Sequence, residues 1–149
     1  MRLEEEIKQQ QFRNQFHKLA VNITFTHSWF MERHSRIFKR FGITPSQFNI
    51  LRILRGRHPQ PASVNLLKER MLDKMSDASR LVDKLFKKGL VNRDICQSDR
   101  RRAEVSVTEK GLQLLSEIDK VESEFDSLFK DLTENEAETL NNLLDKLRG

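Results

Sequence analysis

The chain has 149 residues and a net charge of +5, with 37% hydrophobic and 33% charged residues but only five Gly and three Pro. Its length suits one domain with a real core, and its composition favours helix over sheet or disorder. It has no apolar run near the roughly 20 residues that cross a bilayer, and its first residues lack the apolar core of a signal peptide, so we expect a cytoplasmic protein.

The first 41 residues are predicted to contain a long helix that ends before Gly42. Their apolar side chains recur at helical spacing: Phe12, Phe16, Leu19, Ile23 and Phe30. A second helix is expected next, because residues 44–47 (Thr-Pro-Ser-Gln) supply a capping hydroxyl, proline at the first helical position and glutamine at the third. We expect this helix to end at Gly56 and residues 58–61 to form a loop.

Two further helices are predicted before Gly89, which marks the end of the second one. Ser63 can cap a short helix that contains Leu67. Residues 76–88 follow the i, i+3, i+4, i+7, i+8 pattern of a helix with one buried side, with apolar residues at Ala78, Leu81, Val82, Leu85 and Phe86. The opposite side of that helix is polar.

After Gly89 the spacing of apolar residues changes from helical to alternating. Residues 90–96 are expected to form one strand, and a second strand contains Ala103, Val105 and Val107. The polar segment 97–102 (Gln-Ser-Asp-Arg-Arg-Arg) lies between them. This pattern predicts a two-stranded hairpin with an arginine-rich tip.

The last 40 residues are predicted to return to helix. Apolar residues at coiled-coil spacing predict a seam that needs a partner helix, with members Leu114, Ile118, Val121, Phe125, Leu128 and Leu132. Thr133 and Glu136 form a second capping box, which starts a final helix.

The charges are distributed unevenly over these elements. Residues 1–41, 42–108 and 109–149 have net charges of +4, +7 and −6. A basic middle segment is typical of a surface that attracts nucleic acid, although charges can also simply solvate a surface. Residues 42–108 are predicted to form a helix, a short helix, a third helix and a hairpin, in that order. This is the element order of a winged helix-turn-helix. One helix fits a duplex major groove, and a cationic hairpin can reach the neighbouring minor groove.

These residues resemble the MarR (multiple antibiotic resistance regulator) family of winged helix-turn-helix transcription regulators. The resemblance rests on GITPSQFNILRIL, SRLVDKLFKKGLVNR and DRRRAEVSVTEKG, which together cover about residues 42–115. It implies a mainly α (α+β) fold, with a two-stranded β wing and long N- and C-terminal dimerisation helices. Residues 1–41 and 109–149 would then serve dimerisation, and residues 42–108 would bind DNA.

The resemblance also implies a bacterial homodimer that binds a pseudo-palindromic double-stranded DNA operator. We expect this homodimer to be a repressor. The residues expected to contact DNA are Ser76, Asp77, Ser79, Arg80, Lys84, Arg100, Arg101 and Arg102. In the family, the residue at Asp99 typically braces the wing while Arg100 or Arg101 enters the minor groove. For Arg102, base contact, phosphate contact and plain solvation stay open.

A small aromatic or amphipathic effector is a further expectation from the family. Phe25, Trp29, Phe30 and Phe48 are candidates to line its pocket, although aromatic residues at helical spacing more often belong to a core. The single cysteine, Cys96, is expected to be a buried thiol rather than a redox sensor. The histidines of the first helical region, at positions 17, 27 and 34, do not complete a metal site, so we expect no metal and no cofactor.

Enzymatic activity is not expected, because the sequence has no Gly-rich phosphate loop, nucleophile elbow or supported Cys-His pair. The main alternative function is a winged-helix module for protein–protein interaction without sequence-specific DNA binding. RNA binding is a weaker third, because side chains cannot read the deep, narrow major groove of RNA.

Overall fold

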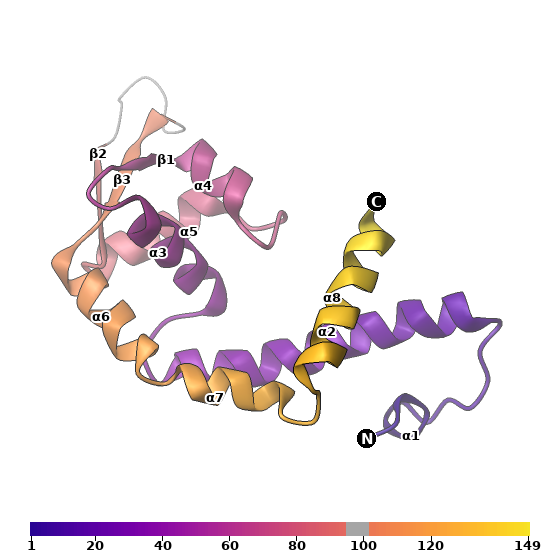
Figure 1. Ribbon diagram of the computed structural model, residues 1–149. Coiled ribbons are helices and arrows are strands. Elements are labelled where there is room, and N and C mark those ends of the chain that lie inside the picture. Colours follow the sequence, from indigo (N-terminus) through magenta and orange to yellow (C-terminus); the bar gives the residue numbers. More distant parts are fainter. Residues whose placement is uncertain (95–101) are drawn as a thin grey trace.

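The computed structural model describes residues 1–94 and 102–149 and shows two regions (Figure 1). One is a lobe of short helices around a small sheet, and the other is an arm formed by the long helix α2 with α7 and α8. The elements are α1 (Leu3–Glu6), α2 (Gln15–Lys39), α3 (Pro45–Arg57), β1 (Ala62–Ser63), α4 (Val64–Arg70), α5 (Ala78–Lys87), β2 (Val91–Asp94), β3 (Glu104–Val107), α6 (Glu109–Asp119), α7 (Glu122–Asp126), the short 3-10 helix η2 (Ser127–Phe129) and α8 (Glu134–Arg148).

The core lies in the lobe, where α3, α4, α5 and α6 pack with the sheet. The arm contributes Phe38, near the end of α2, to this core. The largest fully buried side chains are Phe38, Ile50, Leu51, Leu54, Leu67, Met71, Val82, Leu85, Val91, Val105 and Leu115. Burial of this apolar surface is the main force that holds the lobe together. The apolar pattern predicted for α5 is confirmed at Ala78, Val82 and Leu85, which are all buried.

The helix starts follow the predicted caps. Thr44 and Gln47 form a capping box at α3, and Thr133 and Glu136 form one at α8. Ser63 accepts a hydrogen bond from the backbone N–H of Leu66 at the start of α4. Each of these caps satisfies N–H groups that have no partner inside the helix.

One predicted helix end is wrong. Gly42 and Gly89 have φ angles of 72° and 73°, which is the left-handed conformation that glycine tolerates after a helix. Gly56 instead lies inside α3, which continues to Arg57. The helix is stopped one residue later, at His58, because Pro59 cannot continue it.

The predicted hairpin is part of a three-stranded antiparallel sheet of order β1-β3-β2. In the hairpin, Val91 pairs with Val107 and Asp94 pairs with Glu104. The third strand, β1, pairs Ala62 with Val105 and was missed because two residues are too few to show an alternating pattern. The first strand ends at Asp94, and the rest of its predicted span lies outside the described residues.

The two terminal regions differ from the predicted long helices. Helix α2 begins only at Gln15, capped by Asn14, so that Phe12 precedes it. The predicted seam 114–132 is divided among α6, α7 and η2. The division at Val121 lets Ile118 face the core of the lobe while Phe125 packs on Phe38 of α2. An unbroken helix would carry both side chains in one direction.

Ion pairs lie on both sides of this break. Asp119, the last residue of α6, pairs with Arg55 of α3 at 2.8 Å. Glu124 of α7 pairs with Arg40, next to the end of α2, at 2.7 Å. The guanidinium of Arg40 lowers the pKa of Glu124 by hydrogen bonding. The segment between lobe and arm is thus tied to each of them separately.

Candidate nucleic-acid interface

Helix α5 presents its polar side to solvent because its apolar side is fixed in the core. Ser79, Arg80 and Lys84 are all exposed on this helix. The predicted start was too early: the helix begins at Ala78, and Ser76 lies in the preceding turn. Asp77 caps the helix, where its carboxylate accepts a hydrogen bond from the backbone N–H of Arg80 at 3.1 Å. Asp77, predicted as a DNA contact, therefore also has a structural task.

The turn between α4 and α5 is held by a residue that the sequence reasoning missed. Asn49 is buried in α3, and its side-chain oxygen accepts a hydrogen bond from the backbone N–H of Leu72 at 2.8 Å. Asp73 accepts two more hydrogen bonds. The backbone N–H of Met75 donates to its carboxylate, and the backbone N–H of Ser76 donates to its carbonyl. A polar residue within the apolar pattern of α3 was the available signal for Asn49. These bonds fix how the chain enters α5.

The wing is connected to α5 by Arg93 of β2. Its guanidinium forms an ion pair with Asp83 of α5 and lies over the ring of Phe86, 4.5 Å from the ring centroid. Phe86 was predicted to face the core, but its side chain is 42% exposed and covered by this cation. Ion pairing also offsets the negative charge of Asp83, which would otherwise repel a phosphate backbone. Arg93 was missed because its function depends on a contact across the fold.

We expect Arg93→Ala to lower the free energy of unfolding by about 1 kcal/mol, since it removes a partly exposed ion pair and a cation–π contact. Urea unfolding of Arg93→Ala, Asp83→Ala and the double variant measures the coupling between the two residues. The expected coupling energy is about 0.5 kcal/mol. Strictly additive effects of the two substitutions would contradict the role assigned to the pair.

Only one predicted wing residue lies in the described part of the chain. Arg102 is exposed and stands just before β3. Asp99, Arg100 and Arg101 lie outside the described residues, as does Cys96. Their roles stay predictions. Strand β2, which leads into the wing segment, contacts α5 and pairs with β3.

The four aromatic residues predicted to line one pocket lie in two places. Phe30 stacks on His34, whose ring contacts Phe38, and Phe38 in turn lies 4.5 Å from Phe48 between ring centroids. Phe25 and Trp29 instead line a hollow of about 340 Å³ on α2, together with Met1, Glu6, Ser28, Glu32 and Arg33. The guanidinium of Arg33 lies 4.3 Å from the ring centroid of Trp29.

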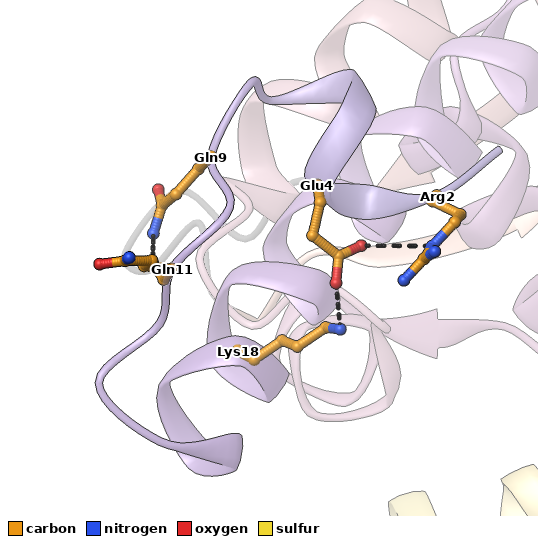
Figure 2. A network of polar contacts seen from close by, with 5 residues as sticks. All are labelled: Arg2, Glu4, Gln9, Gln11 and Lys18. Carbon is orange, nitrogen blue, oxygen red and sulfur yellow. Dashed lines mark hydrogen bonds and ion pairs between the residues drawn. The ribbon is translucent and has the colours of Figure 1, made fainter.

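The N-terminal segment forms one wall of this hollow because it folds back on α2. Glu4 of α1 forms an ion pair with Lys18 of α2, and Arg2 lies 3.9 Å from the same carboxylate (Figure 2). The hydrogen bond from Lys18 lowers the pKa of Glu4. Leu3, in the same segment, is buried. These contacts hold Met1 and Glu6 beside Trp29.

His34 makes the aromatic cluster sensitive to pH. Burial lowers its pKa below the usual 6.5, because the charged ring loses hydration. The unfolded chain therefore binds the proton more readily than the folded chain. The contribution of the neutral His34 ring to folding stability is fully present above pH 6.5 and is lost as pH falls through the lowered pKa. We expect urea unfolding between about pH 7.5 and 5 to show a smaller pH dependence in His34→Phe than in the wild type. His27→Phe, at an exposed position of the same helix, should keep the wild-type dependence.

The described residues contain neither a helix fit to span a membrane nor a cluster fit to hold a metal ion. No helix among them combines the length and the apolar character that crossing a membrane requires. Within residues 1–94 and 102–149, no three His, Cys, Asp or Glu side chains come together as they would around a metal ion.

The middle of the chain is similar to a known protein family. The model of the MarR family matches residues 43–103, from the segment before α3 to the residue before β3. This middle segment matches the MarR family. The chain is similar to the HTH-type transcriptional regulator MhqR of Bacillus subtilis, with 26% identity over 131 residues that cover 87% of this chain and 89% of MhqR.

Solved structures share the fold of this chain. A mutant Escherichia coli MarR in complex with operator DNA matches with a TM-score of 0.77 and 24% identity, over 93% of this chain and 99% of that chain. The organohalide-sensing regulator RdhR, in its 2,4-dichlorophenol-bound form, matches with a TM-score of 0.77 and 21% identity, over 93% of this chain and 85% of that chain.

Proposed function

We propose that this protein is a transcriptional regulator of the MarR type, acting as a repressor, that binds a pseudo-palindromic DNA operator as a homodimer. The observation that carries the proposal is the placement of α5. Its apolar side is buried, its exposed side carries Ser79, Arg80 and Lys84, and Arg93 fixes the wing beside it. A helix presented in this way fits the major groove, while the wing reaches the adjacent minor groove.

The terminal helices support the homodimer. Helix α8 has no buried residue, although its leucines at 140, 143 and 147 form one apolar side. Phe16 at the start of α2 is 80% exposed. Apolar surface of this extent on two helices of one region favours association with a second copy. We therefore keep residues 1–41 and 109–149 as the proposed dimerisation regions and 42–108 as the DNA-binding region.

The dimer can be tested with a matched pair of variants on α8. Leu143, which is 57% exposed, should yield monomers when changed to Glu, because a charge would be buried between the subunits. Asn142→Glu introduces the same charge at the neighbouring exposed position and should remain dimeric. Sedimentation velocity distinguishes the two results. Identical behaviour of the two variants would contradict an interface at this side of α8.

Selection of bound duplexes from a random DNA pool tests the function directly. The expected product is an inverted repeat whose half-sites are about one helical turn, or roughly 10 base pairs, apart. Competition with duplex RNA and with a purified acidic protein separates DNA binding from the two alternatives. Failure to enrich any sequence, with binding to the acidic protein, would favour a protein-interaction module.

We further propose that a small aromatic or amphipathic effector controls operator binding. The hollow beside Phe25 and Trp29 has the size of a small-ligand site, and Arg33 at its edge can pair with an acidic group. The buried indole N–H of Trp29 has no hydrogen-bond partner among the described residues, so a ligand oxygen could accept from it. Trp29 is the single tryptophan, and its fluorescence should respond to aromatic acids that release the operator.

The proposed function requires no catalysis, and we propose that the protein is not an enzyme. A regulator of this kind acts where the chromosome is, so we propose a cytoplasmic location. DNA binding of this type rests on groups of the protein itself and does not call for a metal or a cofactor.

A further inference from the structure

The turn between α4 and α5 exposes two apolar side chains beside the candidate DNA surface. Leu72 is 81% exposed and Met75 is 93% exposed. Figure 1 shows this turn projecting from the lobe between the two helices. Single apolar residues on a surface are common, so their exposure alone indicates nothing. Their significance depends on where the turn holds them.

The turn holds Met75 in a defined position. Its backbone N–H donates to the carboxylate of Asp73 at 2.9 Å, and Asn49 anchors the beginning of the turn through Leu72. Lys74 donates to the carbonyl of Glu69, which ties the middle of the turn back to α4. A chain fixed by these bonds loses little conformational entropy when it binds a partner.

Met75 lies in the turn, three residues before α5 begins at Ala78. Together with Ser76, Ser79 and Lys68 it lines a hollow of about 310 Å³ between the turn and the beginning of α4, whereas Leu72 is not part of this lining. The hydroxyl groups of Ser76 and Ser79 and the cation of Lys68 are of the kind that contact DNA. The carboxylate of Asp77, which also lines the hollow, accepts the hydrogen bond that caps α5. In the proposed complex, the apolar side chain of Met75 would lie among groups that contact DNA.

We propose that Met75 contacts the C5-methyl group of thymine in the major groove, and that each operator half-site has a thymine at that position. Thymine is the base that offers an apolar group in the major groove, and an apolar side chain is its usual complement. The unbranched thioether of methionine adapts its shape to such a contact. This assignment rests on the proposed function, since it requires α5 to enter the groove.

The test uses the operator obtained by selection, with each thymine of a half-site replaced in turn by deoxyuridine. This replacement removes only the methyl group. For the wild type, one or two positions should weaken binding about fourfold, the effect expected from one buried methyl. Met75→Ala and Met75→Gln should bind the thymine and uracil operators equally. Leu72→Ala, from the other exposed apolar residue of the turn, should keep the wild-type discrimination.

Three results would overturn the assignment of Met75 while leaving the regulator intact. These are a half-site without thymine, a wild type insensitive to every replacement, and a Met75→Ala variant with the same uracil penalty as the wild type. Circular dichroism of the variants checks that the fold is kept, as expected for so exposed a side chain. If selection enriches no duplex at all, the proposed function itself fails and the assignment of Met75 fails with it.

Discussion

The Gly111→Ala variant is expected to unfold at a clearly lower urea concentration than the wild type. A Cβ atom at this position would lie 2.4 Å from the carbonyl oxygen of Leu90 and 2.7 Å from Cγ2 of Val107. The backbone at Leu90 cannot easily move, because its carbonyl accepts a hydrogen bond from Thr108 at 3.1 Å. Overpacking of this kind costs about 1–3 kcal/mol or more, which exceeds the gain of up to about 1 kcal/mol in helix propensity.

Gly56→Ala is the matched control, since it makes the same substitution inside another helix. Beyond the helix's own backbone, no described atom lies within 4 Å of a Cβ at Gly56, so only the propensity gain should remain. We expect this variant to be more stable than the wild type by up to about 1 kcal/mol. Equal changes in the two variants would contradict the close packing of α6 against the wing strands.

Replacing Arg80 by alanine should weaken operator binding by about 1–3 kcal/mol, which is roughly 5- to 150-fold. Arg80 is exposed in the first turn of α5, where a helix in the major groove meets base edges. If Arg80 contacts a base, the loss should be largest on the selected operator and small on altered half-sites. Fluorescence anisotropy with both duplexes measures the difference.

Lys87→Ala serves as the control for Arg80, because it removes one positive charge from the last turn of the same helix. Its effect should be smaller and equal on all duplexes. A lost phosphate contact would lower the slope of log affinity against log salt by about 0.9. An Arg80→Ala effect that is uniform across sequences would assign Arg80 to the phosphates instead of a base.

Local signals accounted for much of the fold. The capping boxes at Thr44 and Thr133, the left-handed glycines at 42 and 89 and the buried side of α5 all follow from interactions between residues near each other in sequence. Such interactions are readable because a cap or a helical stripe requires particular residue types at fixed spacing. The resemblance to the MarR family was read from residues of this same middle segment, and the family model matches residues 43–103.

Features that depend on distant contacts were missed. The pairing of Arg93 with Asp83 joins a strand to a helix, and Asn49 supports a turn 23 residues away. The break at Val121 arises because α6 and α7 pack on different regions, which the regular spacing of the seam conceals. The Phe25 and Phe30 side chains were predicted to line one effector pocket, but they face different neighbours.

The break between α6 and α7 acquires a geometric meaning in the proposed dimer. Asp119 is bound to the lobe through Arg55, and Glu124 is bound to the arm through Arg40, so residues 120–123 form, besides the link from α2 to α3, a connection between two separately braced bodies. Two such connections, one in each subunit, would set the distance between the paired α5 helices. A change of angle of a few degrees at this position would displace α5 along the groove, and the operator would then fit only one of the two geometries.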